Sequence, residues 1–317
     1  MKSNNNIEVV ITSATRTAVG SLGKSLKNIR AEELGSSVIS SLIKKNKIKK
    51  NEVDEVIMGQ VLTASSGQNP ARQAAINSGM SVEIPAYVVN QVCGSGIRSV
   101  ASGYQSIKSG DSNILIAGGQ ENMSLAPHAI HLRNGKKLGD AEIIDTMIKD
   151  GLWDAFHGYH MGITAENVAE KFKISRKEQD KFALNSQLKA LKAQKENKFE
   201  HEITEIKIKT GNFEINFNKD EHPREKIDLE TLSNLKPVFK LDGTVTAGNA
   251  SGINDGAAAV TLMSSLEANK RGIQKLVTIR SWASCGVEPA LMGTGPIPST
   301  KKALELAGWN IKDVDLF

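Results

Sequence analysis

One segment of the sequence places a cysteine where a nucleophile could work. Residues 90–97 (NQVCGSGI) join an apolar, strand-like run to an amphipathic, helix-like run, and Cys93 stands at the junction. The unpaired N–H groups and the dipole at a helix N-terminus favour a thiolate, which is the nucleophilic form. Gly94 and Gly96 let a substrate approach the backbone, whose N–H groups could form an oxyanion hole. Cys93 could equally be a small buried core thiol, and the spacing alone leaves both interpretations open.

A second segment contains two histidines and a methionine. His157 and His160 could bind a metal if the segment were helical, but Gly158 and Gly162 favour a loop. No cysteine or histidine follows at ligand spacing, so we expect no metal site. We predict a loop that places histidine and Met161 side chains in a pocket.

Three other features leave their alternatives open. Arg224, on a turn after His-Pro, is a surface charge by itself and an anchor if a phosphate lies near. Residues 247–252 (AGNASG) could let a ligand run along the backbone, or could be a close-packed turn. Cys285 follows a strand-like run but precedes no helix, and we interpret it as structural.

Composition excludes several classes of protein. The chain has 317 residues, of which 39% are hydrophobic and 24% charged, so it can bury a core and form two or three domains. Two cysteines exclude a disulfide scaffold and a zinc ribbon. The net charge is +5, and the basic run at 44–50 is interrupted, so we expect no nucleic-acid partner. No apolar stretch approaches the roughly 18–20 residues of a membrane helix. We therefore expect a cytoplasmic protein with no membrane contact.

Strands and helices alternate along the first part of the chain, which is typical of a sheet covered by helices. The middle part lacks this rhythm and is interpreted as an insertion, although Ser175 and Glu178 form a capping box that predicts a helix to about residue 197. A faint repeat relates residues 7–57 to residues 277–317. The expected strands are 7–12, 53–62, 84–92, 113–117, 203–208, 213–217, 276–281 and 314–317, with regular structure over 244–263, and the expected helices are 31–45, 71–79, 94–108 and 299–307.

Taken together, these segments resemble the thiolase family. Residues 89–96 (VNQVCGSG) resemble its nucleophile motif, and the loop 153–162 is similar to that of the biosynthetic, acetoacetyl-CoA-forming type. Further matches follow in order over essentially the whole chain, at 119–124 (GQENMS), 150–155 (DGLWDA), 158–162 (GYHMG), 164–167 (TAEN), 220–224 (DEHPR), 243–252 (GTVTAGNASG) and 293–296 (GTGP).

The resemblance implies an α/β fold of two related βαβ-type halves, with mixed sheets covered by helices and an inserted loop domain. It implies that Cys93 takes an acetyl group from acetyl-CoA and passes it to a second acetyl-CoA, giving acetoacetyl-CoA and CoA. No cofactor beyond these CoA thioester substrates is implied, and the full-length protein would be a homo-oligomer, a dimer or tetramer. Leu152, His160 and Met161 would line the pantetheine and acyl pocket, Arg224 would lie near the CoA nucleotide, and Ala247, Gly248 and Ser251 would hold the pantetheine arm.

The resemblance also divides the sequence. Residues 1–120 and 244–272 would form the N-terminal half-domain, 121–243 the inserted CoA-binding loop domain, and 273–317 the start of the C-terminal half-domain. Three later motifs of the family, Asn-Glu-Ala-Phe, Gly-His-Pro and Cys-x-Gly-Gly-Gly, do not occur in this sequence. In the family they supply the base for the nucleophile and the group that moves the α-carbon proton. We therefore expect a truncated second half and a chain that is inactive by itself.

Two alternatives remain at this point. The chain could be a non-catalytic truncated remnant or CoA-binding module of a thiolase, since the predicted CoA contacts lie mostly in the inserted domain. It could also be a condensing enzyme of the ketosynthase type, which shares the fold. The sequence around Cys93 and the CoA-type loop argue against the second alternative.

Overall fold

The computed structural model describes residues 7–46, 48–211 and 213–317, which form two compact units. The first unit contains the described residues up to Gly151, with Asn197–His222 and Ile253–Thr278. The second contains Leu152–Glu196, Pro223–Gly252 and Ile279–Phe317. The three-part division predicted from the sequence stays a prediction. Among the described residues, no helix is long and apolar enough to cross a membrane.

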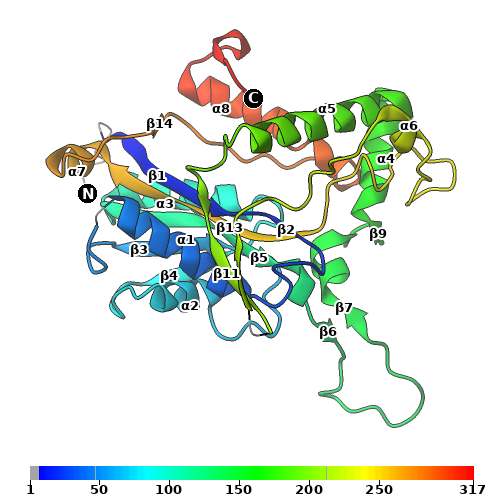
Figure 1. Cartoon of the computed structure of the whole chain (residues 1–317), viewed down its shortest axis with the longest axis horizontal. Coiled ribbons are helices and arrows are strands. Elements are labelled where there is room, and N and C mark those ends of the chain that lie inside the picture. Colours follow the sequence, from blue (N-terminus) through cyan, green and yellow to red (C-terminus); the bar gives the residue numbers. More distant parts are fainter. Residues whose placement is uncertain (1–6, 47, 212) are drawn as a thin grey trace. The chain divides into compact units, whose positions relative to one another are not determined.

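A mixed sheet is the centre of the first unit (Figure 1). Its strand order is β10-β1-β13-β5-β3-β4; β14 also pairs with β1, and β2 with β13. The neighbours of β13 are antiparallel to it, whereas β3 is parallel to both β4 and β5. The strands are β1 (Val9–Thr17), β2 (Gly20–Ser21), β3 (Glu55–Gly59), β4 (Ala86–Val89), β5 (Ile114–Asn122), β10 (Ile203–Thr204), β13 (Asn254–Ser264) and β14 (Val277–Ile279).

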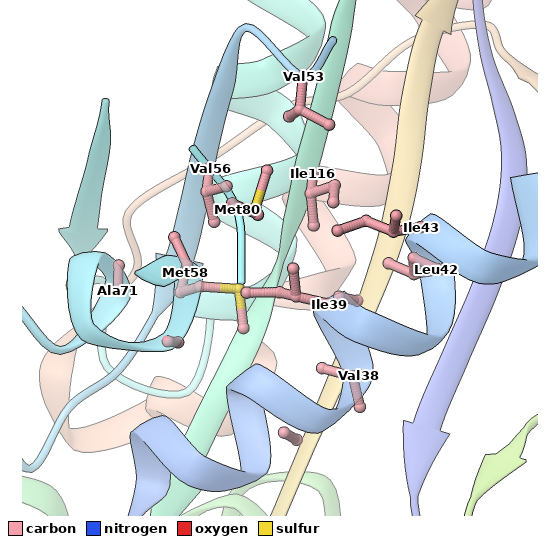
Figure 2. Packing of buried hydrophobic residues seen from close by; sticks show 14 of the residues in the cluster. Val38, Ile39, Leu42, Ile43, Val53, Val56, Met58, Ala71, Met80 and Ile116 are labelled. Carbon is pink, nitrogen blue, oxygen red and sulfur yellow. The ribbon is translucent and has the colours of Figure 1, made fainter. Parts of the chain in front are cut away.

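Helices cover both faces of this sheet because its central strands are apolar on both sides. Helices α1 (Ala31–Asn46) and α2 (Pro70–Asn77) pack on one face, where Ile114 and Ile116 belong to the main hydrophobic cluster. Figure 2 shows the apolar side chains of α1 pointing toward β3 and β5. Leu115, between those two isoleucines, points to the other face and reaches Gly103 of α3 (Ser95–Ser109). The alternation along β5 therefore separates the two helix layers.

Local signals set the helix ends in this unit. Helix α2 starts at Pro70, and the side chain of Asn69 accepts a hydrogen bond from the Arg72 N–H. Helix α3 ends at Gly110, whose φ of 88° is a left-handed conformation that glycine adopts without a Cβ clash. Smaller elements of the unit are the strand pairs β6 (His128–Ala129) with β7 (Ile144–Asp145) and β11 (Ile206–Thr210) with β12 (Phe213–Phe217), the turn η1 (Met123–Leu125) and α7 (Ser265–Lys270).

The second unit is built mainly from helices. The predicted capping box is confirmed, because the Ser175 hydroxyl accepts from the Glu178 N–H while the Glu178 carboxylate accepts from the Ser175 N–H. Its elements are β8 (Trp153–Asp154), β9 (Tyr159–His160), α4 (Met161–Phe172), α5 (Arg176–Lys195), α6 (Leu229–Ser233), η3 (Pro289–Thr294), α8 (Pro296–Ala307) and η4 (Ile311–Asp313), and the π-helix η2 (Met147–Leu152) spans the junction with the first unit.

Three sequence predictions about elements are wrong. The predicted strand at 314–317 is absent from the described residues; instead Asn310 and Asp313 cap the short turn η4. Strand β5, predicted to end at Ala117, runs on to Asn122, because Gly118 and Gly119 continue the pairing with β13. A side chain at Gly118 would overlap the carbonyl oxygen of Ala258. Regular structure over 244–263 holds only from Asn254 onward.

Gly35 in the middle of α1 provides a test of this packing. It faces the buried side chain of Gln120 on β5, and a Cβ at this position would overlap the Gln120 amide oxygen. We expect Gly35→Ala to lower the free energy of unfolding by about 1–3 kcal/mol through overpacking, despite the better helix propensity of alanine. Urea denaturation measures the change, and Ser37→Ala on the same helix is the control. A Gly35→Ala variant as stable as the wild type would contradict this packing.

Candidate active site

Cys93 lies on a tight bend between β4 and α3, and its side chain is exposed. Val92 directly before it has a φ of 48°, a strained conformation for a β-branched residue. The buried Ser95 hydroxyl holds the bend by accepting from the Gln91 N–H at 2.8 Å and donating to the Val92 carbonyl at 2.6 Å. The bend therefore presents the thiol at the start of α3, as the sequence predicted for a nucleophile, and the alternative of a buried core thiol is wrong.

Glycines bring the start of α3 close to the ends of the central strands. Gly59 ends β3, and a Cβ there would lie 2.5 Å from the carbonyl carbon of Ser95. A Cβ on Gly119 of β5 would lie 3.4 Å from the Cα of Gly96. Since no side chain intervenes, the backbone of α3 rests directly on the sheet at this point.

Two hollows open beside Cys93, both within the first unit. One has a volume of about 370 Å³ and the other about 460 Å³, and Cys93, Gly96 and Gly119 line both. Arg16 also lines both; its guanidinium donates to the two carboxylate oxygens of Asp220 at 2.7 and 3.0 Å. The thiol therefore faces space for a small acyl group beside a fixed cation.

Glu121 and Asp255 are two carboxyl groups that line the first of these hollows. Glu121 accepts from the backbone N–H groups of Val61 at 2.8 Å and Leu62 at 3.3 Å. Burial raises the pKa of Glu121 above its ordinary value, these hydrogen bonds oppose the shift, and the nearby Asp255 adds to it. Asp255 is itself buried and accepts from the Ser124 N–H and hydroxyl.

The predicted ligand-binding residues of the second unit lie on two features. His160 and Met161 are at the N-terminus of α4, where the His160 Nδ1 accepts from the Gly162 N–H at 3.0 Å. The neutral ring therefore carries its proton on Nε2, and burial lowers the pKa of His160. The ring stacks on Phe239 with 4.7 Å between centroids. Leu152 is half-buried at the end of η2.

The other feature is the turn at 244–252. Ala247 and Ser251 are exposed on it, while Gly248 is buried with its Cα against Leu232 and Leu235. The structure brings Arg224 to this turn, because its guanidinium donates to the Ala247 carbonyl at 3.1 Å. Two residues that the resemblance assigns to CoA therefore touch each other, although they are 23 positions apart in the sequence.

Around the histidine pair, as elsewhere in the described residues, no group of three metal-ligating side chains occurs. His157 lies on a turn, stacks on Tyr159 with 5.4 Å between ring centroids, and lies 3.4 Å from the buried carboxylate of Asp154. The predicted loop is confirmed at Gly158, which has a φ of 74°, but Gly162 belongs to a helix.

Sequence reasoning missed several residues that shape these features. Glu121 and the buried Glu166 both lie in segments that carry the family resemblance, 119–124 and 164–167, so their motifs were a usable signal. Asp180 on α5 and Phe239 gave no comparable signal, because their roles depend on contacts with residues distant in the sequence.

Comparison with known families agrees with this geometry. The family model "Thiolase, N-terminal domain" matches residues 9–266, and "Thiolase, C-terminal domain" matches residues 273–317. The chain belongs to the thiolase family.

Its relatives are acetyl-CoA acetyltransferases. The protein of that name from Rhizobium meliloti is 55% identical over 98% of this chain and 79% of its own length. The cytosolic acetyl-CoA acetyltransferase of Mus musculus is 49% identical over 98% of this chain and 78% of its own length. The crystal structure of the Bacillus anthracis acetyl-CoA acetyltransferase has a TM-score of 0.96 and 42% identity, and the match covers 98% of this chain and 79% of that chain.

These comparisons correct one expectation. We expected a truncated second half and a chain inactive by itself, but the C-terminal thiolase domain is present as a match over residues 273–317. Neither the truncation nor the inactivity is supported. The predicted α/β thiolase fold is confirmed.

The raised pKa of Glu121 gives a pH-dependent prediction. The pKa of Glu121 is higher in the folded chain than in the unfolded chain, where it is about 4.3. The protonated carboxyl group therefore contributes to the free energy of unfolding below about pH 4.3, and this contribution is lost as the pH rises through the pKa of the folded chain. Glutamine does not titrate, so Glu121→Gln should gain stability relative to the wild type as the pH rises above about 4.3, the ordinary pKa of a glutamate in the unfolded chain. Thermal unfolding at several pH values measures the difference, with the exposed Glu142→Gln as the control for lost charge. A difference that stays constant or shrinks with rising pH would show that Glu121 is not held as described.

Proposed function

We propose that this chain is an acyltransferase of the thiolase type that condenses two molecules of acetyl-CoA to acetoacetyl-CoA and CoA, or runs the reverse thiolysis. The observation that carries the proposal is the exposed thiol of Cys93 on a strained bend, beside two hollows that are large enough for an acyl group. The names of the relatives support the choice of acetyl-CoA.

The first half of the proposed reaction transfers an acetyl group to the protein. The Cys93 thiolate attacks the thioester carbonyl carbon of acetyl-CoA and forms a new C–S bond. The bond between that carbon and the CoA sulfur breaks, and CoA leaves as a thiolate that takes up a proton. The Gly94 and Ser95 N–H groups already donate to the Gln91 and Val92 carbonyls at 3.0 Å, so in this proposal other backbone N–H groups near Cys93 hold the oxyanion that forms on the way.

The second half forms the carbon–carbon bond. A second acetyl-CoA loses a proton from its methyl carbon, which the thioester carbonyl acidifies; over the whole reaction this proton balances the one that the departing CoA thiolate takes up. The resulting carbanion attacks the acetyl-Cys93 carbonyl carbon, and the C–S bond to Cys93 breaks. The thiolate of Cys93 is regenerated and acetoacetyl-CoA is released.

The second unit would bind the CoA portion of the substrate. In this proposal Leu152, His160 and Met161 contact the pantetheine and acyl groups, and the exposed Arg224 lies near the nucleotide phosphates. Ala247, Gly248 and Ser251 contact the pantetheine arm. The contact between Arg224 and the Ala247 carbonyl supports a common role for these two segments.

Three further expectations belong to the same proposal. The chemistry uses thioester substrates only, so no cofactor or metal is needed. The family resemblance supports a homo-oligomer, a dimer or tetramer. A cytoplasmic location is proposed because the Mus musculus relative is named cytosolic.

Acetylation of the chain tests the proposal. After incubation with acetyl-CoA, we expect intact-mass and peptide mass spectrometry to find one acetyl group, on Cys93, because this thiol is exposed beside the hollows. Cys93→Ala should abolish the modification, whereas Cys285→Ala, which removes the other and less exposed thiol, should leave it unchanged.

Two outcomes would overturn it. Acetyl groups spread over lysines, or placed on Cys285, would mean that Cys93 has no special reactivity. CoA binding without any acetyl-Cys93 would favour the CoA-binding module over the enzyme.

A further inference from the structure

We propose that Glu166 and Asp180 are positioning residues that hold the turn 244–252 in the shape that receives the pantetheine arm of CoA. The inference rests on the proposed function and deepens it, because it names two residues that would act through the binding turn. Both are buried side chains on helices of the second unit, Glu166 on α4 and Asp180 on α5.

Glu166 holds the beginning of the turn through hydrogen bonds. Its carboxylate oxygens accept from the Thr244 N–H at 2.8 and 2.9 Å, from the Val245 N–H at 2.7 Å and from the Thr244 hydroxyl at 2.9 Å. Gln179 of α5 donates to the same Thr244 hydroxyl at 2.8 Å. The first two residues of the turn are therefore fixed to α4 and α5 through both backbone and side-chain atoms.

Asp180 holds the later part of the turn through a hydrogen bond from the Asn249 side chain. The Asn249 amide donates to Asp180 at 3.0 Å and to the Thr244 carbonyl at 2.9 Å, while its oxygen accepts from the Thr246 N–H at 2.8 Å. Asn249 thus closes the turn on itself, and Asp180 fixes the orientation of its side-chain amide.

Arg176 connects this network to the residues against which Gly248 packs. The guanidinium donates to the other oxygen of Asp180 at 2.8 Å and to the carbonyls of Leu232 and Leu235 at 2.6 and 2.9 Å. Those two leucines are the residues against which Gly248 packs, so closely that a Cβ there would lie 2.5 Å from each. One ion pair therefore positions both the turn and the surface beneath it.

The charge of these groups makes the arrangement stiff. Burial opposes the ionisation of Glu166, but the hydrogen bonds from Val245 and Thr244 outweigh it and lower the pKa of Glu166. If the turn moved, a buried carboxylate would lose its donors, which costs more than losing an ordinary hydrogen bond. A turn that is fixed before the ligand arrives loses less conformational entropy on binding.

The hydrogen bonds that hold the turn come from buried side chains of α4 and α5, so the opposite side of the turn stays accessible to solvent. Val245 and Thr246 are buried toward the helices, whereas Ala247 and Ser251 are exposed. Arg224 donates to the Ala247 carbonyl from its exposed position. Of the residues of this turn proposed to contact CoA, Ala247 and Ser251 are therefore accessible, whereas Gly248 is buried against Leu232 and Leu235.

Variants of the full chain test the inference. Glu166→Gln and Asp180→Asn keep the shape of each side chain and remove its charge, and Glu170→Gln, one turn along α4 and exposed, is the matched control. Isothermal calorimetry measures the Kd for CoA. The dependence of the Cys93 acetylation rate on acetyl-CoA concentration gives a half-saturating concentration and a maximal rate. Acetylation by phenyl thioacetate, which has no pantetheine arm, reports the state of Cys93 independently.

We expect the two variants to bind CoA about tenfold more weakly, since each loses hydrogen bonds to a charged group. The half-saturating acetyl-CoA concentration should rise by a similar factor, while the maximal rate and the reaction with phenyl thioacetate stay unchanged. Glu170→Gln should match the wild type in every measurement. If both variants bind CoA with the affinity of the wild type, the inference is overturned, while the proposed function of the chain is unaffected.

Two other results are decisive. If the variants lose CoA binding and the phenyl thioacetate reaction in parallel, the two carboxylates have a merely structural role and the inference is overturned. If the wild-type chain itself binds no CoA, the proposed function fails together with the inference.

Discussion

The close approach of α3 to the sheet is the constraint on which the first unit's site depends. Gly59, Gly96 and Gly119 leave no side chain between the start of α3 and the ends of β3 and β5. The chain must then turn sharply between β4 and α3, and Val92 adopts a left-handed conformation at some cost in energy. The Ser95 hydroxyl offsets part of that cost with two hydrogen bonds. The result is a thiol that stands clear of the backbone instead of being packed beneath it.

The second unit uses buried charge where the first uses small residues. Its candidate binding turn has no regular structure, so backbone N–H groups between 244 and 250 need partners that a strand or helix would otherwise provide. Glu166 and the Asn249 side chain supply them, and Asp180 in turn accepts from the Asn249 side-chain amide. Carboxylates suit this role because one group can accept several N–H donors that lie at different angles. An irregular segment is thereby held by specific hydrogen bonds to its backbone N–H groups.

Much of the fold follows from local patterns. Helix α1 starts at Ala31 and α5 at Arg176, as the apolar spacing and the capping box predicted, and Cys93 was placed at a strand–helix junction from its neighbours alone. The wrong predictions concern the glycines after residue 117 and the short run of acidic and apolar residues at the end of the chain, because such residues occur both in strands and outside them. Gly118 and Gly119 continue the pairing of β5 with β13 beyond the predicted end of the strand, and residues 314–317 follow the capped turn η4 without forming the predicted strand.

The sequence by itself determined the family, the α/β class and the candidate nucleophile, because ordered motifs and periodic apolar residues are local properties of the chain. Tertiary structure decided which distant groups meet. Glu166 lies next to residues 244 and 245, and Arg224 next to Ala247, only because helices and loops fold back on each other. A hydrogen-bond partner separated by tens of residues leaves no trace in spacing or composition. The exposure of Cys93 was undecided for the same reason, since it depends on how closely α3 approaches β3 and β5.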